Sequence, residues 1–385
     1  MKEGGFVRKD FQDFVDIINN VIFDKEMDAS DINLEKIYLL AKSHNMRTLL
    51  FCFIKKHFGS DSNIYKAYEH QSDLLSYKYV LQSKEYAAFC SMMQNKKIRY
   101  IPFKGTILKE LYPSPVMREM SDIDILVDKK NMSAVNAYLI KNGYEFEHKG
   151  HHDVYRKEPG ICFEVHETLI DKQRSTGFDK YFENPWQLST PSEFKCLLTP
   201  ENEFIYLIAH LYGHFHQGGI GIRTVLDIYL YRENTNLNFD YINTILEQNE
   251  ILQFADNVMN LADVWFSGAK TSPICEELGE YIMTSGTYGK IERMNLDLSS
   301  SDSSKMKNIL HTVQRKLFLN KKEINTRYPW SKNPLLLPMA YIVRVFDVAI
   351  NHNKEVHHWV NEFKTMDNTK LKEHKERMQR FGVRI

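Results

Sequence analysis

The sequence lacks the usual features of secreted, membrane-spanning and strongly charged proteins. Its five cysteines are scattered and never spaced as CxxC, which argues against a disulfide framework or a zinc ribbon. No stretch approaches the roughly 18 apolar residues that a membrane span requires, and the N-terminus carries charges where a signal peptide needs an apolar run. We therefore expect a cytoplasmic protein with no membrane partner.

Net charge is also absent, because 50 basic residues balance 50 acidic ones. Without a global positive field the chain is not drawn to nucleic acid, so we do not expect a nucleic-acid partner. A hydrophobic content of 43% over 385 residues is enough for more than one packed unit.

The hydrophobic pattern divides the chain into three parts. Apolar residues recur at helical spacing from about residue 11 to 95 and again after about residue 171. Between them lie short β-like runs at 99–103, 122–127, 144–148, 152–156 and 161–166. Pro159-Gly160 marks a tight turn that joins the last two runs as antiparallel strands. The pattern predicts an α+β protein with a small mixed-sheet core at 98–170, flanked by an N-terminal helical region, 1–97, and a C-terminal helical region, 171–385.

Two close carboxylates are the main chemical signal. Because side chains alternate along a strand, Asp122 and Asp124 share one face while Ile123 and Ile125 point to the other. Ionised carboxylates this close repel each other unless a positive charge lies between them. A divalent cation such as Mg²⁺, which prefers oxygen ligands, would relieve the repulsion.

A turn suited to phosphate precedes this strand. The run 99–103 leads into Gly105-Thr106 and then a helix, whose first backbone N–H groups are free to bind an anion. Lys104 and Arg118 add positive charge nearby.

A third carboxylate lies on the last predicted strand. Alternation places Cys162, Glu164 and His166 on one face. If this strand lies beside the strand of the paired aspartates, Glu164 completes a metal site of the kind used for two-metal phosphoryl transfer.

Several motifs together resemble a known superfamily. They are Phe103-Lys104-Gly105, Leu111-Tyr112-Pro113, Arg118, the run 122–127, Glu164-Val165-His166, and His210 with Arg223 and Asp227. This set resembles the DNA polymerase beta-like nucleotidyltransferase superfamily and, within it, a bacterial family called uncharacterised nucleotidyltransferase. The resemblance covers roughly residues 98–232.

The resemblance implies transfer of a nucleoside monophosphate from an NTP, such as ATP, to an acceptor hydroxyl, with release of pyrophosphate. It implies Mg²⁺ or Mn²⁺ as the cofactor, and a small molecule, a peptide or a polymer as the acceptor. The implied catalytic and metal-binding residues are Asp122, Asp124 and Glu164. The implied triphosphate-binding residues are Lys104, Gly105, Thr106, Arg118 and Ser121. Supporting or acceptor-binding positions are His166, His210, Arg223 and Asp227.

Two other functions remain open from the sequence. One is a nucleotide-binding or partner-binding protein that keeps the fold without turnover. The other is a metal-dependent phosphohydrolase, because His151-His152-Asp153 contains an adjacent His-Asp pair, although it begins a strand-like run. His210 and His214 have a spacing that can bind zinc, and Arg223 and Asp227 have the spacing of an intrahelical ion pair.

Overall fold

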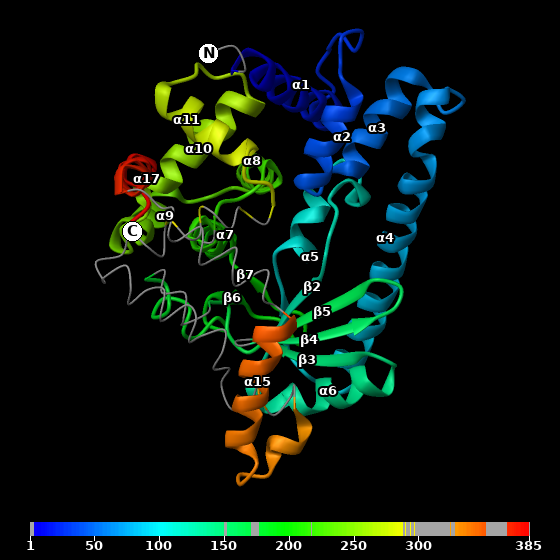
Figure 1. Ribbon diagram of the computed structural model, residues 1–385, viewed down its shortest axis with the longest axis vertical. Helices are drawn as coiled ribbons and strands as arrows, with labels where there is room; N and C mark the ends of the chain where they lie inside the picture. Colours follow the sequence, from blue (N-terminus) through cyan, green and yellow to red (C-terminus); the bar gives the residue numbers. More distant parts are fainter. Residues whose placement is uncertain are drawn as a thin grey trace.

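A five-stranded mixed sheet is followed and preceded in the chain by helices (Figure 1). The computed structural model describes residues 4–149, 152–170, 177–216, 218–287, 328–351 and 368–384, together with the single positions 289, 293, 296 and 324. In spatial order the strands are β1 (Tyr100–Pro102), β2 (Ile123–Val127), β5 (Ile161–His166), β4 (His152–Lys157) and β3 (Glu145–Lys149). Each of the five predicted strands is present, so the α+β prediction is confirmed.

The strand pairing brings the predicted carboxylates together. β2 pairs antiparallel with β1 and parallel with β5, and the register places Asp124 opposite Glu164. β4 and β5 pair antiparallel across a turn in which Gly160 has φ 73°. Glycine suits this turn, because a positive φ is unfavourable for residues with a side chain. The predicted turn is confirmed, and the pairing of β2 with β5 meets the condition under which Glu164 joins the aspartates.

The two faces of β2 belong to two different hydrophobic cores. Ile123, Ile125 and Val127 pack with residues of α4 (Asn63–Asn95) and α6 (Met132–Lys141). Leu126, on the opposite face, packs into a larger core that is formed mainly by the other helices. Asp124 shares the face of Leu126 by alternation, so its carboxylate lies on the side of the sheet that the helices cover.

Helices from both ends of the chain build the larger core. The N-terminal helices besides α4 are α1 (Gly4–Phe23), α2 (Leu34–Ser43) and α3 (Arg47–Phe58). The C-terminal helices are α7 (Pro200–Phe215), α8 (Ile222–Asn234), α9 (Phe239–Gln248), α10 (Leu252–Phe266), α11 (Pro273–Met283) and α17 (Asn368–Phe381). Side-chain N-caps start α2, α4, α9 and α11, at Asn33, Ser62, Asn238 and Ser272. Phe14 and Phe53 from one end and Phe204 and Phe254 from the other lie in this single core.

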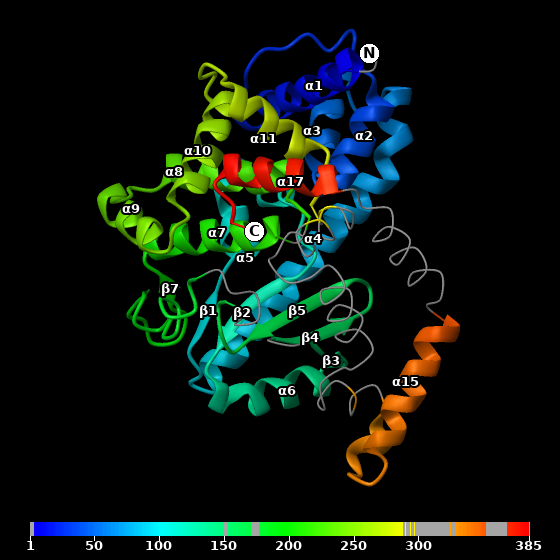
Figure 2. The same cartoon turned by 60° about the vertical axis from the view of Figure 1, so that its left-hand side comes forward.

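The remaining elements among the described residues are short or peripheral. They are α5 (Gly105–Leu108), η1 (Lys109–Leu111), η2 (Pro115–Met117), η3 (Lys129–Asn131), β6 (Ser189–Thr190), β7 (Leu197–Leu198), η5 (Pro329–Lys332) and α15 (Leu337–Asn351). α15 stands apart from the other described helices (Figure 2). In the part of the chain that the structure describes, no helix is both long and apolar enough to cross a membrane.

His44 links the N-terminal helices to the C-terminal ones. It is fully buried, its Nδ1 accepts a hydrogen bond from the Ile222 N–H at 3.2 Å, and its Nε2 lies 3.2 Å from the Met283 carbonyl oxygen. Nε2 therefore carries the hydrogen, and both ring nitrogens are bonded in the neutral form. A Cβ on Gly221 would lie 2.8 Å from Nδ1, so this contact needs glycine. Burial lowers the pKa of His44 to about 4.

The buried neutral state of His44 predicts a loss of stability in mild acid. The unfolded chain takes up a proton near pH 6.5, whereas the folded chain takes it up only near pH 4, so the free energy of unfolding falls as pH drops between these values. Between pH 7 and pH 5 this residue should account for a loss of about 2 kcal/mol. Urea unfolding of the wild type and of His44→Gln at both pH values measures it. An equal loss in the two proteins would show that other groups are responsible.

Candidate active site

A cavity of about 340 Å³ lies between the sheet and helices α7 and α8. Its volume is within the usual range for small-ligand sites. The predicted site residues that line it are Lys104, Gly105, Arg118, Ser121, Asp122, Asp124, Glu164, His166, His210, Arg223 and Asp227. Thr106 is the exception, since it is buried away from the cavity lining and its hydroxyl has no hydrogen-bond partner among the described residues.

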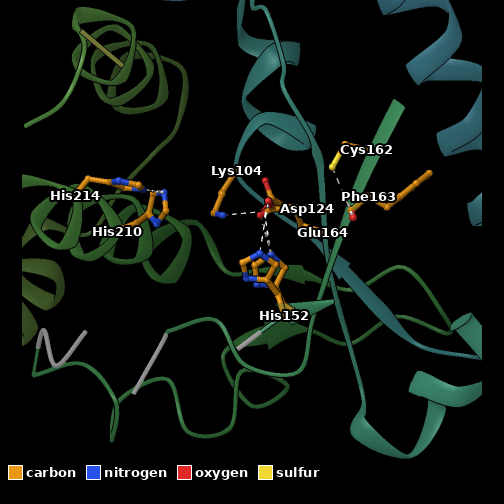
Figure 3. A network of polar contacts seen from close by, with 9 residues as sticks. Lys104, Asp124, His152, Cys162, Phe163, Glu164, His210 and His214 are labelled. Carbon is orange, nitrogen blue, oxygen red and sulfur yellow. Dashed lines mark hydrogen bonds and ion pairs between the residues drawn. The ribbon is translucent and has the colours of Figure 1, made fainter. Parts of the chain in front are cut away.

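Asp124 is held by two donors that meet on one of its oxygens. Lys104 Nζ lies 2.8 Å from Oδ1 (Figure 3). His166 Nε2 lies 3.0 Å from the same atom. Burial alone would raise the pKa of Asp124, but Lys104 and His166 outweigh it and hold the pKa well below its usual value. Asp124 is therefore an anion across the working pH range. Both of these donors bond Oδ1 and not Oδ2.

Lys104 reaches Asp124 from a strained turn. It is the residue before α5 and has φ 53° and ψ −130°, a backbone conformation that residues with a side chain rarely adopt. Such strain costs about 1–3 kcal/mol and is typical of functional sites. Burial lowers the pKa of Lys104, but attraction to Asp124 outweighs it and raises the pKa, so the amine stays charged.

Asp122 lies directly before β2 and has a different environment from Asp124. Burial raises its pKa to about 7, and repulsion from Asp124 and Glu164 adds to the effect. Attraction to Lys104 and Arg223 offsets only part of this effect, so the three carboxylates together still disfavour the ionisation of Asp122. Their oxygens are the ligands that Mg²⁺ and Mn²⁺ prefer, so the residues present fit a divalent cation.

Two histidines flank Glu164 on the β4–β5 pair. His152 and His166 are cross-strand partners, and their rings stack at 4.8 Å with an interplanar angle of 30°. The Glu164 oxygens lie 3.6 Å from His152 Nε2 and 3.7 Å from His166 Nε2. His152 and Asp153 lie in β4, so this His-Asp pair is not on a helix as in the helical phosphohydrolases; His151 lies outside the described residues.

Arg118 is bonded to Asp227 in a buried pair. Its Nε and Nη2 each donate to one Asp227 oxygen at 2.8 Å, and the Tyr112 hydroxyl donates to the same carboxylate at 2.8 Å. The expected intrahelical pair of Asp227 with Arg223 is therefore wrong, because Arg118 and Tyr112 already engage both Asp227 oxygens. A Cβ on Gly105 would lie 2.5 Å from Arg118 Nη1. Gly105 thus allows the guanidinium to lie against the turn.

Arg223 also lines the cavity, but its contacts differ from those of Arg118. Its Nη1 donates to the Glu119 carbonyl oxygen, and its Nε has no hydrogen-bond partner among the described residues. The Glu119 carboxylate is itself engaged by Arg47 and by the Thr48 N–H. Over the described ranges no carboxylate lies within ion-pair distance of Arg223, so its charge is available to an anionic ligand.

Helix α7 forms the opposite wall of the cavity with residues one turn apart. Tyr206 stacks on His210 with ring centroids 5.7 Å apart, and His210 Nε2 lies 3.1 Å from His214 Nε2 (Figure 3). The Tyr206 hydroxyl is buried and has no hydrogen-bond partner within the described chain.

Sequence reasoning did not assign His152, Tyr206 or His214 to the site. Tyr206, His210 and His214 are spaced four residues apart, which predicts that they share one face of α7. For His152, the signal was the Pro159-Gly160 turn, because counting outward from it places His152 opposite His166.

The comparisons with known proteins agree with this geometry. Residues 30–267 match the family described as uncharacterised nucleotidyltransferase, which covers more than half of the 385 residues. No curated protein and no solved structure shows significant similarity to the chain. The match runs from before α2 to the end of α10, so it includes the sheet, helices on both sides and every cavity-lining residue except Thr287. The chain belongs to the uncharacterised nucleotidyltransferase family.

Proposed function

We propose that the cavity transfers a nucleoside monophosphate from an NTP to an acceptor hydroxyl, with release of pyrophosphate. One observation carries the proposal: Asp122, which directly precedes β2, lines one cavity with Asp124 of β2 and Glu164 of the parallel strand β5, and both of these carboxylates oppose the ionisation of Asp122. Family membership supports nucleotidyl transfer in general.

Asp122, Asp124 and Glu164 would hold Mg²⁺ or Mn²⁺. Such an ion polarises the phosphoryl oxygens and lowers the pKa of the attacking hydroxyl. The two aspartates differ in how readily they ionise. Lys104 and His166 keep Asp124 ionised, whereas Asp122 loses its proton near pH 7 and supplies the remaining charge.

The triphosphate would lie along the Gly105 turn and the segment that leads to Asp122. Lys104, Ser121 and Arg223 line this part of the cavity. Arg118 would contribute shape more than charge, because Asp227 already neutralises it. Arg223 has no such carboxylate, so it is the stronger candidate for a direct phosphate contact.

The α7 wall would then contact the acceptor. Tyr206 and His210 face the carboxylates across the cavity, which leaves room between them for the attacking hydroxyl. Imidazole nitrogens can accept or donate a hydrogen bond, so His210 would orient that hydroxyl.

The proposal is tested by following the α-phosphate. Purified protein is incubated with Mg²⁺, α-labelled ATP and a lysate fraction, and products are identified by mass spectrometry. Pyrophosphate release together with an NMP mass shift on an acceptor supports transfer. ATP binding without pyrophosphate release across a broad acceptor panel would instead indicate a nucleotide-binding protein without turnover. Hydrolysis that survives Asp122→Asn would indicate a phosphohydrolase.

The paired aspartates should differ when each is replaced by asparagine. Both variants should lose transfer by roughly a hundredfold or more, since each removes a charged ligand. Asp122→Asn should be at least as stable as wild type above pH 7, because the raised pKa means that ionising Asp122 opposes folding. Asp124→Asn should be less stable by roughly 2 kcal/mol, because Lys104 loses its charged partner. Denaturant unfolding at pH 8 and a transfer assay measure both effects; equal stability changes would contradict the assigned environments.

Cation binding should depend on pH through Asp122. Below pH 7 its proton must leave before the ion binds, so Mg²⁺–ATP affinity should fall about tenfold for each pH unit. Calorimetry at pH 6 in two buffers of different ionisation enthalpy should show release of about one proton. The control is Asp122→Asn, which should show weaker binding with no pH dependence over this range. Wild-type affinity that is constant from pH 6 to pH 8 would refute the role of Asp122.

Arg223→Gln should weaken binding of ATP but not of adenosine. Loss of a charge-assisted hydrogen bond predicts roughly a tenfold or greater loss of ATP affinity. Arg223→Lys should recover part of it. Arg232→Gln is the matched control, since Arg232 lies on the same helix but pairs with Asp263. If Arg223→Gln reduces ATP and adenosine affinity equally, the residue shapes the cavity and does not bind phosphate.

A further inference from the structure

A second set of metal-type ligands lies next to the paired aspartates. We propose that His152, Glu164 and His166 bind a transition metal ion such as Zn²⁺, Co²⁺ or Mn²⁺. Their ligand atoms all lie within 4.8 Å of one another. This triad, the β4–β5 triad, rests on strand geometry and holds whether or not Glu164 also serves an ion at Asp122 and Asp124.

The strand register fixes the triad. His152 and His166 are directly opposite across the antiparallel β4–β5 pair, and Glu164 lies two residues before His166, on the same face. The three side chains therefore converge without any loop. Glu164 is 19% exposed and His152 is 12% exposed on their side chains, so an ion can enter from the cavity.

The distances between Glu164 and the two histidines are close to those found between ligands of one metal ion. The Glu164 oxygens lie 3.6 Å and 3.7 Å from the two Nε2 atoms, beyond the usual N–H···O range. Two atoms bound to one ion, each at about 2.0–2.2 Å, are typically ~3–4 Å apart. The three ligand atoms span up to 4.8 Å, so side-chain rotations that shorten this span would place them around one centre.

The donor set determines the class of ion. Mg²⁺ prefers oxygen ligands and keeps several waters, whereas two imidazoles with one carboxylate suit transition metals. An ion on His166 Nε2 takes the place of the hydrogen that Nε2 now directs at Asp124 at 3.0 Å. Glu164 and Asp124 balance the added charge, while the Lys104 ammonium on Asp124 opposes it.

The test uses full-length, nucleotide-free protein stripped of metal with a chelator. Zn²⁺ binding is measured by calorimetry with Mg²⁺ in tenfold excess. Wild type should bind Zn²⁺ despite the Mg²⁺, and His152→Gln should weaken binding by roughly a hundredfold, since even outer-sphere changes cost 10–100-fold. The matched control is His214→Gln, which removes an imidazole from the opposite wall of the same cavity and should leave Zn²⁺ affinity within threefold.

The other outcomes overturn the proposal. Loss of Zn²⁺ binding in His214→Gln but not in His152→Gln would move the site to α7. Loss in Asp122→Asn alone would place the ion at the aspartates. If His152→Gln does not fold, electron paramagnetic resonance of Cu²⁺ in His214→Gln decides, with coupling to two imidazole nitrogens expected and an all-oxygen pattern contradicting the triad. Mg²⁺–ATP binding is read in the same proteins. Its loss in Asp122→Asn only would support the proposed function independently of the triad.

Discussion

The pairing of Asp124 with Lys104 and His166 is the contact on which the site depends. A buried carboxylate is unfavourable unless it is matched by positive charge and hydrogen bonds. Lys104 supplies the charge from a strained turn after β1, and His166 supplies a hydrogen from β5. The Asp124 carboxylate of β2 therefore links the turn that follows β1 to β5. The strain at Lys104 persists because this ion pair offsets it.

The segment before Asp122 is fixed by both helical regions. Arg118 is bonded to Asp227 of α8, the Glu119 carboxylate accepts from the first turn of α3, and the Met120 carbonyl accepts from Gln82 of α4. Three successive residues thus contact three helices. The position of Asp122 consequently depends on helices from both ends of the chain, which agrees with a family match that extends well beyond the sheet.

The local patterns predicted most of this architecture, and the long-range contacts were not accessible to them. Alternation correctly identified the strands, because strand geometry is encoded within a few residues. The adjacency of β2 and β5, which brings Glu164 opposite Asp124, was only a condition at the level of sequence. The Arg118–Asp227 pair joins residues 109 apart, and no local period reports such a contact. Helical spacing instead favoured Arg223 as the partner of Asp227. The buried fork of Arg118 took that carboxylate because it forms two parallel hydrogen bonds, with the Tyr112 hydroxyl adding a third.

The two aspartates of one short motif thereby acquire different electrostatic properties. Asp124 is neutralised within the protein, and its charge is permanent. Burial and repulsion act on Asp122, whose side chain has no ion pair or hydrogen bond within the described ranges, and its pKa rises to about 7. A second lysine beside Asp122 would neutralise it and stabilise the fold, but the site would then no longer favour an external cation. Because Asp122 has no matching cation among the described residues, its ionisation opposes folding. A bound cation with its anionic ligand would remove this unfavourable term, so the free energy recovered would add to the free energy of binding.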